Sequence, residues 1–158
     1  MNKDLTIDFG ASMLNIRVLL LIKYKGGYLF ELNTDDYYFA IGGRVKFGES
    51  SSEAAKRELK EELDYNDLEL ELIGLIENFF VIGEKSVHEV NFVYGGAIKD
   101  EIDFNNLKSD HQGFNFLLPE EVRSCDVRPK VLKDLILKLP HNEKKIDEII
   151  HLVNRDSA

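Results

Sequence analysis

The alternation of apolar and polar residues predicts β-strands through much of the first two thirds of the chain. Residues 13–23 are apolar and partly β-branched, Gly26-Gly27 interrupts them, and residues 28–32 resume an extended pattern, which is typical of a β-hairpin. A short strand is expected over 37–41, running into Gly42-Gly43. Period-two patterns predict further strands in three places: near 67–81, near 87–98 and over 114–117.

A helical periodicity begins at residue 50. The segment Ser50-Ser51-Ser52-Glu53 has the form of a capping box, in which the Ser50 side chain accepts from the Glu53 backbone N–H and the Glu53 side chain reaches back. Apolar residues then recur at four-residue spacing on one face: Ala55, Leu59 and Leu63. Later helices are expected in three places: from Pro119, over 128–139 and over 143–154.

Strands and helices are interspersed along the whole chain, which favours an α/β or α+β fold. No repeat, low-complexity tract or Pro/Gly/Ser-rich linker separates them. A hydrophobic content of 44% suits one compact domain with a substantial core. We therefore expect a single domain over residues 1–158.

Charge and cysteine content exclude several classes of protein. A formal charge of −9 argues against tight binding to nucleic-acid backbones, which needs a dense basic face. Cys125 is the one cysteine, so no intrachain disulfide forms, and a reduced cytoplasmic location is expected. The apolar run Val18 to Ile22 is far shorter than the ~20 residues that a membrane span requires.

Three glutamates lie at the spacing that brings side chains together on a helix. Glu58, Glu61 and Glu62 are at i, i+3 and i+4. Like charges so placed destabilise a helix by roughly 0.2–0.5 kcal/mol per pair, whereas a divalent cation would reverse that effect. Carboxylates suit Mg²⁺ or Mn²⁺, although most Glu-rich helix faces are simply solvated. The loop before the helix, residues 42–49, contains Gly42, Gly43 and Gly48 and ends at Glu49.

Taken with that loop, the segment resembles the box of the Nudix hydrolase family, G-x5-E-x7-R-E-U-x-E-E-x-G-U, where U is bulky and apolar. The matching positions are Gly43, Glu49, Arg57, Glu58, Leu59, Glu61 and Glu62. Asp64 stands where the family has glycine, Tyr65 where an aliphatic residue is usual, and Ile41 where many members have proline. Asp tolerates the left-handed conformation that follows a helix, so we expect altered stability and not lost chemistry.

The resemblance implies a Nudix-type α/β/α sandwich with a mixed β-sheet and a dependence on Mg²⁺, with Mn²⁺ as an alternative. It implies that Glu58 and Glu62 ligate the cation, and that Glu61 shares this ligation or orients and deprotonates the attacking water. Arg57 is expected to hold Glu49, and ligation of a second metal ion by Glu49 is the alternative. Gly43 is expected to contact substrate.

Other candidates lie outside the box. The general base varies in position within the family, which leaves Glu77, Glu89 and Asp110. Arg17 interrupts an apolar strand and faces either a substrate phosphate or solvent. His88 is more often a structural residue than a substrate contact at such a place. The same holds for four aromatic residues on predicted strands: Tyr37, Tyr38, Phe79 and Phe80.

The expected activity is hydrolysis of a phosphoanhydride bond in a nucleoside diphosphate joined to another group. A free nucleotide such as a (d)NTP is favoured over RNA ends because the chain is acidic. The alternative is a catalytically weak nucleotide-sensing or protein-binding module, for which Asp64 is the support. An isomerase on the same fold ranks lower, since Cys125 lies late in the chain. A homodimer is left open, and no membrane or stable nucleic-acid partner is expected.

Overall fold

The computed structural model describes residues 3–107, 109, 111–139 and 148–156. The described strands are β1 (Thr6–Asp8), β2 (Ser12–Tyr24), β3 (Gly27–Leu32), β4 (Tyr38–Phe39), β5 (Ile41–Arg44), β6 (Glu71–Ile82), β7 (Lys85–Ala97), β8 (Phe114–Leu117), β9 (Val127–Arg128) and β10 (Ile150–Arg155). The described helices are α1 (Ser51–Leu63), α2 (Pro119–Ser124), α3 (Val131–Lys138) and the short 3₁₀ helix η1 (Phe104–Asn106). None of these helices has the length and apolar character of a membrane span.

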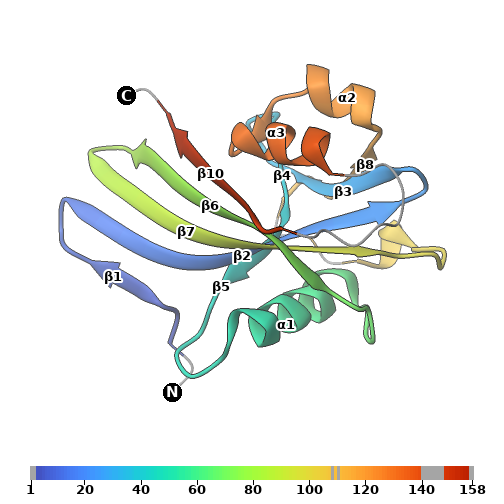
Figure 1. Cartoon of the computed structure of the whole chain (residues 1–158), viewed down its shortest axis with the longest axis horizontal. Helices are drawn as coiled ribbons and strands as arrows, with labels where there is room; N and C mark the ends of the chain where they lie inside the picture. Colours follow the sequence, from blue (N-terminus) through green and yellow to red (C-terminus); the bar gives the residue numbers. More distant parts are fainter. Residues whose placement is uncertain (1–2, 108, 110, 140–147, 157–158) are drawn as a thin grey trace.

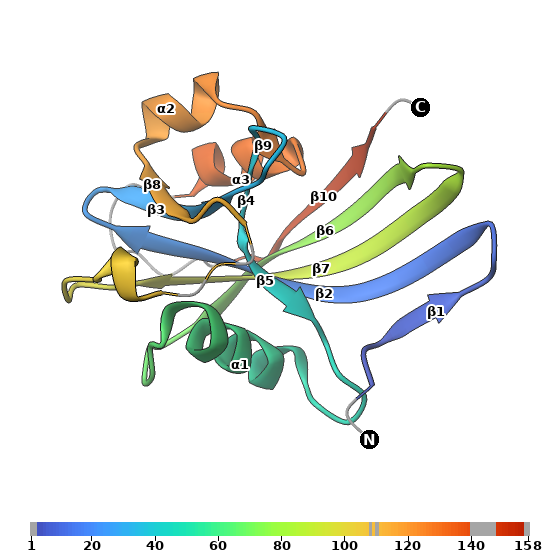
Figure 2. The ribbon, with the colours of Figure 1, turned by 180° about the vertical axis from the view of Figure 1, so that it is seen from behind.

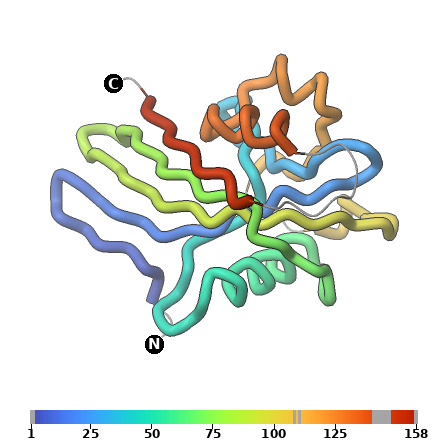
Figure 3. Tube along the Cα trace, viewed as in Figure 1, coloured from blue at the N-terminus to red at the C-terminus, as the bar shows by residue number. Residues whose placement is uncertain are grey.

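The strands form one curled mixed sheet in the order β10-β6-β7-β2-β3-β4-β9 (Figure 1). β2 runs parallel to β7, β7 runs antiparallel to β6, and β6 runs parallel to β10. The tube view shows β10 lying beside β6 at the edge of this group (Figure 3). The mixed sheet that the family resemblance implies is confirmed.

The long strand β2 organises the other half of the sheet. Along one edge it pairs successively with β1, β5 and β3, all antiparallel. The turn between β2 and β3 contains Lys25 and Gly26, both with positive φ, so the predicted hairpin is confirmed. Because β5 joins the middle of β2, Gly42 and Gly43 pair with Leu19 and Val18 inside the sheet.

Helices cover the two faces of the sheet, as the view from behind shows (Figure 2). Residues of β2 alternate between these faces. Val18, Leu20 and Ile22 pack with the apolar face of α1, including Leu59 and Leu63. Leu19 and Leu21 belong to a second core cluster, which contains residues of α2 and α3. The layered arrangement expected from the family resemblance is therefore present.

Two predicted elements have different bounds in the structure. The strand expected over 37–41 is divided into β4 and β5, because β4 pairs with β3 whereas β5 pairs with β2. The helix expected over 128–139 begins only at Val131, because Val127 and Arg128 pair with β4 as the strand β9. Pro129, which lies inside the range of that predicted helix, precedes the observed one. Pairing with β4 therefore decides the conformation of Arg128, against its local helical pattern.

The helix expected over 143–154 is wrong for its described part. Residues 150–155 form the edge strand β10, while 143–147 lie outside the described residues. Ile150 and Leu152 pack against the core cluster that contains α3, and Asn154 is buried. The backbone groups of β10 pair with β6, whose edge would otherwise be unpaired. Tertiary pairing overrides the helical pattern.

Candidate active site

The start of α1 is fixed by the capping box predicted from the sequence. The Ser50 hydroxyl accepts from the Glu53 backbone N–H at 3.2 Å, and Glu53 Oε2 accepts from the Ser50 backbone N–H at 2.7 Å. These bonds satisfy two of the donors that a helix leaves unpaired at its N-terminus. The cap therefore sets the register in which the three glutamates follow.

Gly43 provides the space that the Glu58 carboxylate occupies. Gly43 pairs with Val18 in the middle of the sheet, and a Cβ atom added to it would lie 2.2 Å from Glu58 Oε1. Glu58 is only 7% exposed, so it is held between α1 and β5. Gly42 has a φ of +151°, and a Cβ atom there would lie 2.1 Å from the backbone oxygen of Val18. Only glycine fits either position without movement of a neighbour.

Arg57 fastens the box loop to α1. Its Nη2 donates to Glu49 Oε1 at 2.7 Å and its Nε donates to Glu49 Oε2 at 3.2 Å. Arg57 Nη2 also donates to the backbone oxygen of Arg44 at 2.9 Å, and Glu49 Oε1 accepts from the Lys46 backbone N–H at 2.7 Å. A two-bond contact between guanidinium and carboxylate fixes both position and orientation.

The same guanidinium offsets the repulsion among the helix carboxylates. Arg57 Nη1 donates to Glu58 Oε1 at 2.6 Å and to Glu61 Oε2 at 3.0 Å, and Lys46 Nζ lies 3.9 Å from Glu61 Oε1. Glu62 is half-buried one position further along α1. Across the described ranges, no group of three or more acidic, histidine or cysteine side chains is already gathered to hold an ion. The predicted ligands are neighbours, but cations of the protein neutralise two of them.

The family model described as the NUDIX domain matches residues 8–136. This range contains the box, the strands from β2 to β9 and the helices α1 and α2. The chain belongs to the Nudix hydrolase family. No curated protein matches the sequence closely enough to narrow this assignment.

Solved structures of low sequence identity have the same fold. A MutT protein from Bacillus halodurans is 19% identical, with a TM-score of 0.65 over 79% of this chain and 83% of its own. The dihydroneopterin triphosphate pyrophosphohydrolase of E. coli is 17% identical, with a TM-score of 0.63 over 78% and 93%. An Ap4A hydrolase of C. elegans is 19% identical, with a TM-score of 0.55 over 78% and 93%.

The two departures from the Nudix box lie at the end of α1. Asp64 follows the helix in the left-handed conformation, with φ 46° and ψ 34°, and its backbone N–H donates to the Lys60 carbonyl. Tyr65 is partly buried against the core cluster beneath α1, and its hydroxyl donates to Asp100 at 2.6 Å. The residues at both positions thus fulfil local structural requirements.

Replacing Asp64 by glycine is expected to stabilise the domain by up to about 1 kcal/mol, because glycine adopts the left-handed conformation without the Cβ penalty. The substitution also removes the ion pair between Lys60 and Asp64, which at 3.3 Å on the surface contributes little. Urea denaturation measures the difference, and turnover should not change. A destabilised Asp64→Gly variant would show that the aspartate side chain contributes more than its conformation costs.

The Arg57–Glu49 contact makes the stability of the box loop depend on pH. Hydrogen bonds from Arg57 hold the pKa of the Glu49 carboxyl below its usual value, and burial only partly opposes them. A carboxyl with a lowered folded-state pKa stabilises the fold above its unfolded-state pKa, which is about 4.3 for glutamate. The stabilisation from the Glu49 carboxylate decreases as the pH falls below the unfolded-state pKa, and it is lost once the pH has fallen through the folded-state pKa.

Glu49→Gln should therefore destabilise the domain more at neutral pH than in acid. The difference in free energy of unfolding between wild type and Glu49→Gln, measured in urea at about pH 7 and about pH 3.5, is expected to shrink at the lower pH. An equal difference at both values would mean that the charge of Glu49 does not contribute.

The candidates outside the box are distributed over both faces of the sheet. Glu89 is buried, and its Oε1 lies 3.6 Å from Arg17 Nη1. Glu77 instead contacts histidines, with Oε1 2.9 Å from His151 Nε2 and Oε2 3.7 Å from His88 Nε2. Asp110 lies outside the described residues. Of the two candidate bases that the structure describes, Glu89 is the one that contacts Arg17, the predicted phosphate-binding residue.

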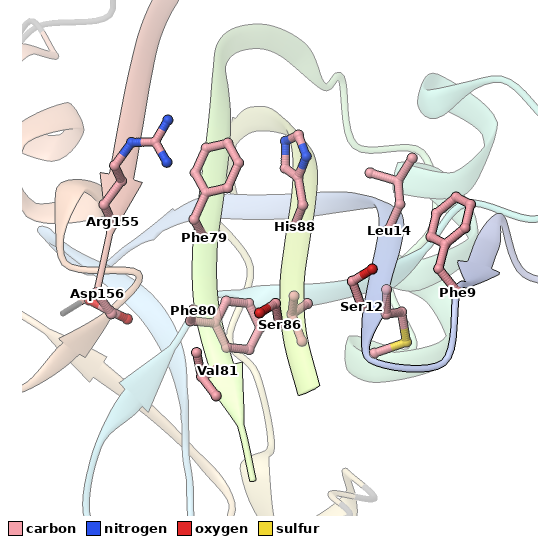
Figure 4. Close-up of a pocket in the computed structure, with 12 residues that line it drawn as sticks. Phe9, Ser12, Leu14, Phe79, Phe80, Val81, Ser86, His88, Arg155 and Asp156 are labelled. Atoms are coloured by element: carbon pink, nitrogen blue, oxygen red, sulfur yellow. The ribbon is translucent and has the colours of Figure 1, made fainter. Parts of the chain in front are cut away.

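A pocket of about 580 Å³ lies at the outer end of the sheet, and none of the residues that line it belongs to the Nudix box. Figure 4 shows Phe79, His88 and Leu14 projecting side by side from three neighbouring strands. Phe79 and His88 stack at 4.1 Å between ring centroids, and Arg155 lies 4.0 Å from the centre of the Phe79 ring. The pocket is thus separate from the cluster around Arg57.

Of the other aromatic candidates, Phe80 also lines this pocket, whereas Tyr37 and Tyr38 lie elsewhere. Tyr38 packs against the core cluster and meets Phe30 edge to face, whereas the Arg128 guanidinium covers the ring of Tyr37. These contacts agree with a structural role. Cys125 is partly buried against the same core cluster and is a free thiol.

Sequence reasoning missed Arg44 and Lys46. Arg44 pairs directly with Arg17 across β2 and β5, and Lys46 approaches Glu61. Both were visible in the loop as basic residues beside the glycines, but their partners depend on the register between β2 and β5. No signal in the sequence gives that register.

Proposed function

We propose that this Nudix domain hydrolyses a phosphoanhydride bond in a nucleoside diphosphate joined to another group. The observation that carries the proposal is the joint arrangement of loop and helix. Glu58 fills the space beside Gly43, while Arg57 links Glu49 of the loop to the carboxylates of α1. On an ordinary solvated helix face the acidic side chains point into water, so no glycine of a neighbouring strand is required to make room for one of them.

The donor set suits Mg²⁺, with Mn²⁺ as the alternative. Glu58, Glu61 and Glu62 would hold the cation with oxygen atoms alone, which is the ligand type these ions prefer. When bound, the cation would neutralise phosphate oxygens and lower the pKa of a water molecule. The ion pairs that Glu58 and Glu61 form with Arg57 and Lys46 are consistent with this fit, because they are the contacts expected of ionised carboxylates.

The residues of the chain have separate roles in this proposal. Arg57 holds Glu49 and thereby positions the box loop against α1, which favours the clamp role for Glu49 over ligation of a second ion. Glu61 is half-exposed and contacts Arg57 at one oxygen, so it is the box acid best able to orient and deprotonate a water molecule. Glu58 is nearly buried and serves as a ligand of fixed position.

The favoured substrate is a free nucleotide such as a (d)NTP. The net charge of −9 disfavours long RNA, which needs a basic track. Two proteins of the same fold are named for phosphate-rich small molecules, dihydroneopterin triphosphate and Ap4A. We further expect a cytoplasmic enzyme without a membrane or nucleic-acid partner. Whether it forms a homodimer is left to solution measurements.

The proposal is tested by incubating the protein with (d)NTPs, ADP-ribose and dinucleoside polyphosphates, each with Mg²⁺, with Mn²⁺ and with chelator. Products are identified by mass. Cleavage at a phosphoanhydride bond only in the presence of a cation is the expected result. Binding of a nucleotide without cleavage of any member of the panel would instead indicate the sensing-module alternative.

A further inference from the structure

Two arginine side chains lie directly opposite each other on one face of the sheet. Arg17 on β2 is the register partner of Arg44 on β5. Partners in an antiparallel pair project to the same face. Arg17 alternates with Leu19 and Leu21, which belong to the core cluster of α2 and α3, so this face is opposite to the one that α1 covers.

The arginine pair is incompletely neutralised. Like charges directly opposite in a sheet destabilise it. Arg17 Nη1 lies 3.6 Å from Glu89 Oε1, and Arg44 Nη1 lies 3.6 Å from Asp4 Oδ2, so both ion pairs are longer than hydrogen bonds. Arg44 Nε is buried and has no hydrogen-bond partner. The side chains remain 26% and 40% exposed, respectively, so a ligand can reach them.

A row of buried polar side chains, which crosses four adjacent strands beside Arg17, holds Arg17 in place. Glu89 is 8% exposed and accepts from the amides of Asn15 and Asn78, both at 3.4 Å. Asn78 in turn accepts from Asn154 at 2.8 Å. These residues occupy register positions on four adjacent strands. A buried polar row of this kind fixes the orientation of its members, and Glu89 therefore serves as a positioning residue for Arg17.

The pair is adjacent to the proposed site of hydrolysis. Arg44 directly follows Gly43, and its backbone oxygen accepts from Arg57. Within the described residues β5 pairs with β2 alone, so no strand covers the other edge of β5. Arg44 is thus one residue along β5 from the glycine that makes room for the Glu58 carboxylate.

We propose that Arg17 and Arg44 together bind the terminal phosphate of the substrate. This inference rests on the proposed function and narrows its substrate to nucleotides with a free, doubly charged terminal phosphate. Two guanidinium groups match such a phosphate in charge and in donor number. A dinucleoside polyphosphate, whose phosphates are all esterified or internal, offers them less charge and no free end.

The test compares Arg17→Gln and Arg44→Gln with Arg123→Gln, a control on the exposed surface of α2. Each of the first two is expected to raise KM for a nucleoside triphosphate roughly ten- to hundredfold, as the loss of charge-assisted hydrogen bonds predicts, with little change in kcat. KM for a dinucleoside polyphosphate should stay within about twofold. An equal rise for both substrates, or no rise for either, would overturn the inference.

Binding of inorganic tripolyphosphate, measured by calorimetry without a divalent cation, separates this inference from the proposed function. Loss of binding in Arg44→Gln supports the anion site even if no nucleotide is hydrolysed. Hydrolysis together with unchanged binding in both variants refutes the site while the proposed function stands. Arg17→Gln leaves Glu89 buried without its cation, so Arg17→Lys is included and should bind with intermediate affinity.

Discussion

Glu62→Gln is expected to lower kcat about a hundredfold or more while the domain remains folded. The substitution keeps the size of the side chain but removes the negative charge that a divalent cation needs from its ligand. Glu62 is half-buried on α1, beyond the residues that fill the space beside Gly43. The loss should appear in kcat with Mg²⁺ and with Mn²⁺, measured by product formation under saturating nucleotide.

Glu120→Gln, which removes one exposed acid from α2, is the matched control and should keep full activity. Thermal unfolding of both variants verifies that they are folded. Activity of Glu62→Gln within about threefold of wild type would remove Glu62 from the proposed ligand set.

Gly42→Ala is expected to lower mainly the stability of the domain, whereas Gly43→Ala is expected to lower mainly its activity. At Gly42 the added methyl group meets the backbone of Val18, and φ is +151°, so we expect a loss of stability of about 2–4 kcal/mol. At Gly43 the methyl group meets the carboxylate of Glu58, which can move. Gly43→Ala should therefore lower kcat/KM roughly ten- to hundredfold with a much smaller change in stability, as urea denaturation and turnover measure together.

Gly83→Ala is the control for a positive φ without a close neighbour. Gly83 lies between β6 and β7, has a φ of +60°, and nothing lies within 4 Å of the added atom. It should show a modest loss of stability and unchanged activity. Full activity of Gly43→Ala would mean that the position of the Glu58 carboxylate does not matter for turnover.

Local sequence patterns predicted those helices, strands and turns whose conformation does not depend on pairing with a distant segment. The Ser50 cap, the β2–β3 turn and the long alternating strands follow from residue type and spacing, and the structure has each of them. Elements that depend on a distant partner were missed. The segment 150–155 contains apolar residues in a pattern compatible with either structure, and pairing with β6 makes it a strand.

The candidate site divides in the same way. Fixed spacing within the box identified the glycine, the arginine and the acids, because the family motif is local in sequence. The Arg17–Arg44 pair joins residues that are far apart in the sequence, and it arises only when β5 aligns with the middle of β2. Glu89 could be proposed only as one of several acids until its contact with Arg17 was known.

The most direct test of the central claim is hydrolysis of a (d)NTP in ¹⁸O-labelled water, followed by mass with increasing Mg²⁺ and again with chelator. The account predicts that no product forms in chelator, that product formation rises with Mg²⁺, and that a single ¹⁸O atom enters one of the two phosphate products, as expected for water attack on phosphorus. Hydrolysis that continues at the same rate in chelator, or label found at carbon and not at phosphate, would contradict it.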